Sequence, residues 1–334
     1  MTTASGLRLS VLDTAPVWSD TTPATALNEA VELARAAESA GYVRYWLAEH
    51  HNTPSVASVT PAVLAARLAA ATTSLRVGSG GVILPNHPPL IVAEQFGTLQ
   101  ALFPGRIDLG IGRAGALDGP TATALRRGAD RDFPAHLAEL FGYFSPADPR
   151  HPRPVQAVTA VGNAPDVWLL GSSPDSARLA GRLGLPYAFA HHFNPAGAAA
   201  AAAEYHRAFE PSPVRARPDL ILAATVVVAQ TDAEAARLAL PVAVSMVLLR
   251  SGQPPQLLPT DAEAARYPLT PAQRAAVAER LETHVIGGPD RVRAKIAQLV
   301  EATGAAEVIA TTSTHDFGAR VHSYELLAKV AEEL

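Results

Sequence analysis

The sequence predicts an α/β fold in which parallel strands are joined by helical crossovers. Short apolar runs of β-forming residues alternate with alanine-rich amphipathic stretches along the whole chain, which is typical of β–α–β units. Eight such units can be counted, and no change in composition separates one half of the chain from the other. Because eight strand–helix units can close a sheet on itself, we predict one domain over residues 1–334, a (β/α)₈ TIM barrel. An open, doubly wound sheet is the alternative.

The predicted strands are short apolar segments. In chain order they are 7–13, 43–48, 75–84, 106–112, 166–171, 186–191, 220–229 and 307–312. The stretch 25–41 illustrates the helices between them, since its apolar residues recur at i, i+3, i+4 and i+7 and it stops at Gly41. Such a helix has one apolar face, which can pack on a sheet.

Two intervals are longer than a simple crossover, and they predict insertions after the fourth and the seventh strands. Residues 143–165 are rich in proline and glycine, and residues 250–270 read RSGQPPQLLPTDAEAARYPLT. Long loops without structure of their own are often lids or binding loops, so we predict that 250–270 is a mobile lid. A plain surface insertion is the alternative.

The composition excludes several classes of protein. With 31 acidic and 27 basic residues, the chain lacks the basic character that favours nucleic acid. It contains no cysteine, which excludes disulfides, a thiolate nucleophile and a thiolate metal site. The N-terminal MTTASGLRLS lacks the pattern of a secretory signal, and the longest apolar stretch, 238–249, is too short to span a membrane. We therefore expect a cytoplasmic protein that binds neither nucleic acid nor membrane.

Three titratable residues, Glu49, His50 and His51, follow the second predicted strand. Active sites of such barrels lie at the C-terminal ends of the strands, so proton transfer, metal binding and plain surface exposure are all interpretations of this group. Successive side chains along a strand face opposite ways, so at most one of the two histidines should face the mouth of the barrel. Neither an HExxH pattern nor a three-histidine spacing accompanies them, which disfavours a zinc site.

A second histidine pair, His191 and His192, ends the sixth predicted strand. One of the two is expected to line the same mouth as a pocket residue. His87, His284 and His315 lie in predicted loops and are interpreted as ordinary polar surface.

The segment GIGRAG, residues 110–115, matches the GxGxxG pattern of dinucleotide sites and follows a predicted strand. Gly119 and Pro120 interrupt the place where the required helix should begin, and no acidic residue closes a neighbouring strand about 20 residues later. We therefore interpret Arg113 as a guanidinium at the strand end that can bind a phosphate. The alternative is a surface arginine in an ion pair.

The segment 171–184, GSSPDSARLAGRLG, predicts a helix that is capped by Ser173 and begins at Pro174. The free N–H groups of a helix N-terminus can hold a phosphate, although Ser-Pro caps also begin helices that bind nothing. In a closed barrel, Arg113 at the end of the fourth strand and Ser172 at the end of the fifth are neighbours. Together they predict one phosphate site.

Gly80 and Gly81 stand within the third predicted strand, where glycine weakens the strand and needs a physical reason. One reason is the close approach of a flat ligand to bare backbone, and the other is a β-bulge.

Four segments together resemble the bacterial luciferase-like, flavin-dependent monooxygenase family, and the resemblance extends over almost the whole chain. They are WLAEHHN, VGSGGVILPNHPP, FPGRIDLGIGRA and GLPYAFAHHF. The resemblance implies a (β/α)₈ barrel that binds reduced FMN (FMNH₂) at the strand C-termini and receives it from a separate NAD(P)H-dependent flavin reductase. It also implies that O₂ adds to the flavin C4a position and that the resulting peroxyflavin oxygenates a small organic substrate.

The resemblance further implies roles for residues around the flavin ring. His50 matches the family's catalytic histidine, which takes part in proton transfer, and His51 is its less critical neighbour. Gly80 and Gly81 match a pair that is joined by a non-prolyl cis peptide bond under the ring.

At the other end of the cofactor, the resemblance places the FMN phosphate at Arg113, Ser172, Ser173 and Ser176. Ser172 stands where the luciferase catalytic chain has a glutamate, and its role would be carried by its backbone N–H.

The preferred hypothesis is an FMN-dependent monooxygenase without a metal, nearest to the branch of the family that tailors polyketides and antibiotics, and a homodimer. A relative that uses the deazaflavin F420 for hydride transfer would share the barrel and consume no O₂. A flavin-binding barrel without turnover is disfavoured by His50, which the family's non-catalytic chains lack. A zinc hydrolase is the remaining alternative.

Overall fold

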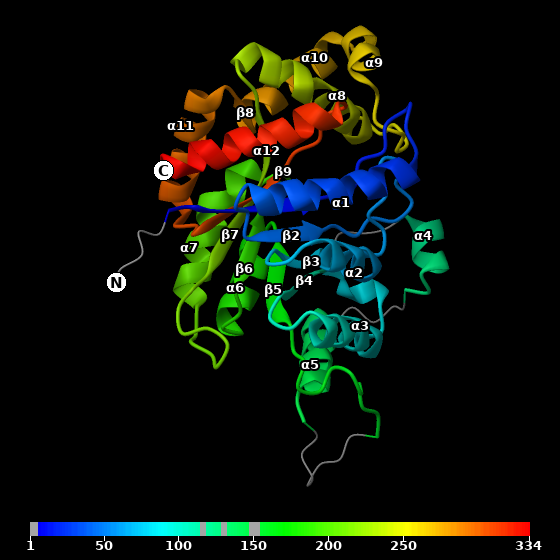
Figure 1. The fold of residues 1–334 in the computed structure, drawn as a ribbon, viewed down its shortest axis with the longest axis vertical. Helices are drawn as coiled ribbons and strands as arrows, with labels where there is room; N and C mark the ends of the chain where they lie inside the picture. The colour runs from blue at the N-terminus through cyan, green and yellow to red at the C-terminus, as the bar shows by residue number, and fades with distance from the viewer. Residues whose placement is uncertain (1–5, 114–117, 128–131, 147–153) are drawn as a thin grey trace.

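The computed structural model describes residues 6–113, 118–127, 132–146 and 154–334, and it forms a closed barrel of eight parallel strands (Figure 1). Each strand pairs with the next in the order β1, β2, β3, β4, β5, β6, β7, β9, and β9 pairs with β1 to close the ring. The strands are β1 (Arg8–Asp13), β2 (Arg44–Leu47), β3 (Arg76–Ile83), β4 (Ile107–Gly112), β5 (Asp166–Gly171), β6 (Tyr187–Ala190), β7 (Leu220–Val228) and β9 (Glu307–Thr311). The predicted TIM barrel is confirmed, and the open sheet is excluded.

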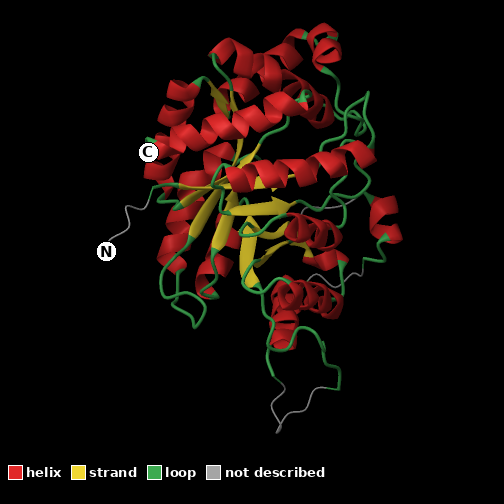
Figure 2. Cartoon of the chain, in the orientation of Figure 1, coloured by secondary structure: helices red, strands yellow, loops and turns green. Residues whose placement is uncertain are grey.

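Helices surround the strands on the outside of the barrel (Figure 2). Six of the twelve α-helices that the structure describes begin with a proline in the first turn after a Ser, Thr or Asp cap; Thr22, for example, caps α1 by accepting from the Thr25 N–H. The helices are α1 (Pro23–Ser39), α2 (Pro61–Ala71), α3 (Pro89–Leu102), α4 (Gly119–Ala124), α5 (Phe133–Phe144), α6 (Pro174–Arg182), α7 (Ala198–Ala208), α8 (Asp232–Arg250), α9 (Asp261–Arg266), α10 (Pro271–Thr283), α11 (Pro289–Thr303) and α12 (Phe317–Glu332), with short 3₁₀ turns η1 (Leu84–Asn86) and η2 (Pro195–Gly197).

The apolar core has two layers because side chains on each strand alternate between the two faces of the sheet. The larger layer lies between the sheet and the helices. The smaller layer fills the barrel and includes Leu12, Trp46, Trp168, Ile221 and Ile309. Trp46 and Trp168 meet edge to face, with ring centroids 5.6 Å apart, so the barrel interior is packed rather than hollow.

Charged side chains close the N-terminal end of the barrel, which we call the floor. Arg44 donates from Nε to Glu307 Oε1 at 2.7 Å and from Nη1 to Asp108 Oδ2 at 2.9 Å. Trp46 Nε1 and Arg76 Nε also donate to Asp108, at 2.9 and 2.8 Å. Arg44, Arg76 and Glu307 are the first residues of their strands, so the network belongs to the floor and lies far from the strand C-termini.

The segment after β7 contains more structure than the sequence predicted. A ninth strand, β8 (Val285–Gly287), pairs with the end of β7 outside the ring, and no strand was predicted there. The interval 250–270 was expected to lack structure, but it contains α9, and Leu258 pairs with Trp18 in the loop after β1. Helices α8, α9 and α10 gather at one end of the molecule (top of Figure 1). The mobility of 250–270 stays a prediction.

The interval 143–165 after β4 is also partly structured, since α5 extends to Phe144. Residues 147–153 of this interval lie outside the described part of the chain. Among the helices that the structure describes, none is long and apolar enough to cross a membrane.

Candidate active site

The candidate site is the mouth of the barrel, by which we mean the C-terminal ends of the strands and the loops that follow them. His50 lies there, just beyond the end of β2, and its backbone N–H donates to the Ser58 carbonyl at 3.2 Å. Its Nδ1 is buried and has no hydrogen-bond partner. Burial lowers the pKa of His50, and the nearby Glu49 only partly opposes this shift. The imidazole is therefore neutral near pH 7 and able to accept a proton.

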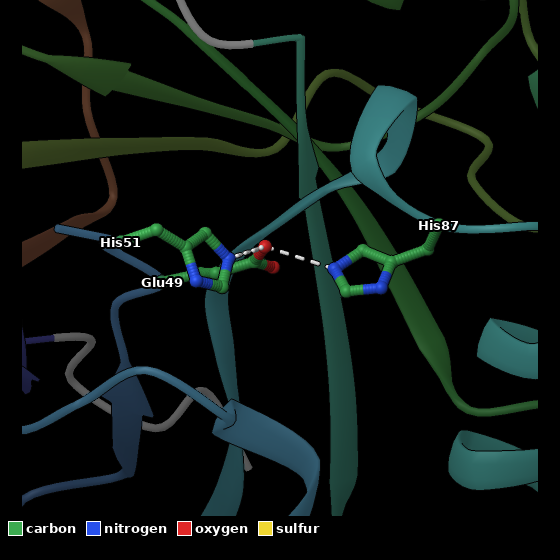
Figure 3. Close-up of side chains that lie close together, drawn as sticks. All are labelled: Glu49, His51 and His87. Atoms are coloured by element: carbon green, nitrogen blue, oxygen red, sulfur yellow. Dashed lines mark hydrogen bonds and ion pairs between the residues drawn. The ribbon is translucent and has the colours of Figure 1, made fainter. Parts of the chain in front are cut away.

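His51 has a different environment from its neighbour. Its Nε2 lies 2.8 Å from Glu49 Oε1, and His87 Nε2 lies 2.8 Å from the same oxygen, so Glu49 sits between two imidazoles (Figure 3). The other oxygen, Oε2, accepts from the Ile83 backbone N–H at 3.0 Å. His87 is thus a half-buried partner of Glu49, and the prediction that it is ordinary polar surface is wrong.

Glu49 is buried, yet its pKa lies below the usual range. Burial alone would raise the pKa, but hydrogen bonds from His87, the Ile83 backbone and His51 outweigh it. Glu49, His51 and His87 form the group of potential metal ligands found among the described residues, with ligand atoms within 4.8 Å of one another. Their hydrogen bonds account for the arrangement without a metal ion, so we treat the three as a hub that ties the end of β2 to the end of β3.

The second histidine pair lies close to the first. His192 Nδ1 lies 3.0 Å from the Ala223 carbonyl, and burial lowers its pKa to about 4, with a smaller effect from nearby basic groups that include His50. His191 is buried, and its Nδ1 has no partner. Both pairs therefore lie at the C-terminal ends of their strands, and which member of each faces the mouth stays a prediction.

His284 was interpreted as polar surface, and this is wrong because its side chain is only 2% exposed. It precedes β8 and lies near Arg280. Neither His284 nor Arg280 belongs to a sequence motif that connects it to the site. His315, by contrast, is partly exposed and pairs with Asp20 at 3.1 Å.

The glycine pair lies on β3, and the peptide bond between Gly80 and Gly81 is cis, as the resemblance implies. The pairing of β3 with β4 shifts register between Gly80 and Val82, so a bulge is present. A Cβ on Gly80 would come within 2.7 Å of Leu12 Cδ1, and one on Gly81 within 2.7 Å of the Gly110 carbonyl oxygen. The packing of the barrel itself thus requires glycine at both positions.

The predicted phosphate residues lie at the ends of two adjacent strands, since β4 pairs with β5 through Ile111 and Leu169. Arg113 is exposed just beyond β4 and forms no ion pair with a described residue. The alternative, in which Arg113 is a surface residue in an ion pair, is therefore not supported by the part of the chain that the structure describes, and its phosphate-binding role stays a prediction.

The N-terminus of α6 provides the other half of the predicted phosphate site. Ser173 and Ser176 form a capping box, but both backbone-to-hydroxyl bonds are long, at 3.4 Å. Ser176 Oγ also contacts the Tyr187 hydroxyl at 2.9 Å. The carbonyl of Ser172 accepts from Asn194 Nδ2 at 3.0 Å. Capping bonds of 3.4 Å are weak, so N–H groups at this helix end remain available to a ligand.

The last two residues of the GIGRAG segment lie within 114–117, outside the described residues, and the next described helix, α4, is a short one that Asp118 caps. Gly119 and Pro120 form the first turn of this helix, so they start a helix rather than interrupt one.

Comparison with known proteins identifies the family. The model of the luciferase-like monooxygenases matches residues 7–307. A luciferase-like monooxygenase from Escherichia coli (strain K12) is 42% identical over 332 residues, covering 98% of each chain. The chain belongs to the luciferase-like monooxygenase family. It is accordingly an enzyme of the monooxygenase class.

Two further members of the comparison have names that bear on structure and chemistry. The solved structure of apo-MsnO8 shares 40% sequence identity with this monooxygenase and a TM-score of 0.89, covering 98% of each chain. The N-acetyl-S-alkylcysteine monooxygenase of Bacillus subtilis (strain 168) is 38% identical over 240 residues, covering 69% of this chain and 70% of its own.

Proposed function

We propose that this luciferase-like monooxygenase uses reduced FMN and O₂ to oxygenate a small organic substrate, and that a separate NAD(P)H:flavin reductase supplies the FMNH₂. The proposal is carried by what lies toward the C-terminal ends of β2 to β5: a buried imidazole whose Nδ1 has no partner, a bare glycine backbone, and donors on adjacent strand ends that could bind a phosphate. Reduced FMN, when bound, would supply the electrons for the reaction with O₂, in which one oxygen atom is transferred to the substrate and the other is reduced to water.

The residues present fit a flavin phosphate. Arg113 offers a planar guanidinium that no carboxylate of the described residues pairs with, and the weakly capped N–H groups of Ser173 and Ser176 lie at the end of the adjacent strand. Ser172 adds a backbone N–H at the end of β5. Together these groups would bind the phosphate and fix the orientation of the cofactor.

The ring end of the proposed cofactor site is formed by β2 and β3. Gly80 and Gly81 present backbone without side chains beside the mouth. His50 would take or hold a proton at the edge of the site, because its lowered pKa keeps it neutral and its Nδ1 has no protein partner. His51, which binds Glu49, would act by positioning His50, and His191 and His192 would line the substrate side.

Solved structures with the same fold illustrate both cofactor alternatives. The oxygenating constituent of 3,6-diketocamphane monooxygenase from Pseudomonas putida, 22% identical with a TM-score of 0.71, is described in complex with FMN. A secondary alcohol dehydrogenase, 13% identical with a TM-score of 0.67, is described as F420-dependent. These likenesses show the fold alone, so the choice of FMN rests on the monooxygenase family and on the residues of the mouth.

The substrate class that the sequence resemblance favours is a polyketide or another secondary metabolite, and a homodimer is the proposed assembly. The experiment that tests the proposal is an anaerobic titration with FMNH₂ or reduced F420, followed by admission of air. We expect FMNH₂ to bind, O₂ to be consumed and the His50→Ala variant to change the rate at which the oxidised flavin spectrum returns. Binding of F420 without O₂ consumption would contradict the proposal.

A further inference from the structure

A second group of basic side chains lies at another part of the mouth, away from the proposed phosphate site. Arg280 is on α10, and His284 follows the same helix, with the His284 N–H donating to the Arg280 carbonyl at 3.2 Å. Their side chains lie on the same side, because both contribute to the lining of one cavity. Both line a cavity between α8, α10, β7, β8 and the end of β9.

Neither side chain has a hydrogen-bond or ion-pair partner among the residues that the structure describes. Both ring nitrogens of His284 are buried without a hydrogen bond, although the residue is only 2% exposed. The half-buried guanidinium of Arg280 forms no ion pair or hydrogen bond with any residue that the structure describes. A buried donor without a partner costs free energy of folding. Such groups are therefore expected mainly where a ligand forms the missing hydrogen bonds.

The ionisable groups that lie near Arg280 and His284 are basic residues. Burial lowers the pKa of Arg280 to about 10, with a contribution from Arg250. Burial also lowers the pKa of His284 to about 3, and the neighbouring Arg280, His191 and His192 add to the shift. At these pKa values the histidines are neutral near pH 7, so the positive charge here belongs to Arg280 and Arg250, and neither forms an ion pair with a carboxylate among the described residues.

The remainder of the cavity lining indicates the size and polarity of a ligand. Val227, Val242 and Ile286 provide an apolar wall, and Thr311 and Ser313 provide hydroxyls. A ligand that satisfies all of these groups has a short aliphatic part and an anionic end. A carboxylate matches the guanidinium because both are planar and can form two parallel hydrogen bonds.

We propose that Arg280 and His284 anchor a carboxylate of the substrate, whose aliphatic part lies against β7 and β8. The anchor lies on the same side of the barrel as the proposed reacting centre, since Arg280 and His50 both contribute to the lowered pKa of His192. This inference names the substrate class of the proposed monooxygenase site and therefore rests on the proposed function. It would make Arg280 a specificity-determining residue that turns the reacting part of the substrate toward His50.

The test uses the protein without flavin and compares pentanoate with pentanamide, its neutral isostere, by ligand-observed NMR titration. Wild type should bind pentanoate more tightly. Arg280→Gln should weaken pentanoate by about 10-fold or more, the scale of a lost charge-assisted pair, and leave pentanamide within about 2-fold. Arg274→Gln, on the exposed side of the same helix, is the matched control and should change neither.

Two further variants separate an anchor from a structural role. Arg280→Lys keeps the charge and should keep most of the preference for pentanoate, whereas His284→Gln should lose part of it. Equal binding of the two probes to wild type, or an unchanged preference in Arg280→Gln, would overturn the anchor.

A final comparison separates this inference from the proposed function. Arg280→Gln should not change the preference for FMN over riboflavin; a loss of that preference would mean that Arg280 binds the flavin phosphate, and the anchor would be wrong. If FMN fails to bind while Arg280→Gln still abolishes the pentanoate preference, the anchor stands and the proposed function falls. If FMN binds and wild type does not distinguish pentanoate from pentanamide, the proposed function stands and the anchor is wrong.

Discussion

The two ends of this barrel differ in how completely their buried ionisable groups are paired. At the floor, Arg44 is held by Glu307 and Asp108, and all three are nearly inaccessible to solvent. At the mouth, nitrogens of His50 and His284 are buried without any partner. A satisfied buried network stabilises one structure, whereas an unsatisfied group costs free energy and is retained where a ligand or a reaction uses it. The difference indicates that the mouth is the functional end.

The largest expected effect concerns the floor. Arg44→Met leaves Glu307 and Asp108 buried with fewer positive partners, so it should lower the free energy of unfolding by about 3 to 5 kcal/mol. Urea denaturation measures this. Arg35→Gln removes an exposed ion pair with Glu32 and should cost less than about 1 kcal/mol. Equal losses in the two variants would mean that the floor network does not stabilise the barrel.

The second prediction concerns activity at the mouth. His50→Gln should reduce the turnover of a substrate found in a reductase-coupled screen by about 10²- to 10⁴-fold, the usual contribution of proton transfer. The same variant should unfold at nearly the wild-type urea concentration, because His50 Nδ1 has no partner to lose. His322→Gln, on the exposed face of α12, is the control and should keep full activity. Full turnover in His50→Gln would remove this residue from the mechanism.

The contrast between the ends also shows what the sequence could predict. Each of the eight barrel strands was placed to within about one residue at either end, because apolar runs bounded by polar residues are a strong local signal. Strand β8 was missed since Val285–Gly287 is too short to form such a pattern. Local patterns therefore predicted the eight barrel strands and missed β8, which lies outside the ring.

Contacts between distant segments were beyond the reach of those patterns. Glu49 and His87 are 38 residues apart, and Arg44 and Glu307 are 263 apart, so neither pair leaves a local signal. His284 was interpreted as polar surface, which is the usual place of a histidine in a loop. Its burial depends on how α8 and α10 pack beside β7 and β8.

The third prediction uses the pH dependence of stability at the mouth. The pKa of His284 is lowered to about 3, so the unfolded state binds more protons as pH falls below the unperturbed value of about 6.5. Stability should therefore decrease on acidification, and His284→Gln should remove on the order of 2 kcal/mol of the loss between about pH 7 and about pH 5. Urea midpoints at both pH values give the comparison. A variant with the wild-type pH dependence would show that His284 is not buried in its neutral form.

The smallest effect is expected at the hub of Glu49, His51 and His87. Glu49→Gln keeps the shape but removes the charge that accepts the hydrogen bonds, so it should lower stability at neutral pH by about 1.5 kcal/mol. The pKa of Glu49 is lowered, so its contribution is present above the unperturbed value and is lost as pH falls through the folded value. The variant should match wild type in strong acid. Glu325→Gln, which removes an exposed carboxylate–histidine pair, should not measurably change stability. An equal loss of stability in Glu325→Gln would mean that the hub contributes no more than an exposed pair.

The affinity of Arg113→Gln for FMN and for riboflavin tests most directly the claim that the free groups of the mouth bind a flavin phosphate. Wild type should bind FMN more tightly than riboflavin, and Arg113→Gln should reduce that preference by about 10-fold or more without changing the urea midpoint. An unchanged preference for FMN in Arg113→Gln would contradict the account.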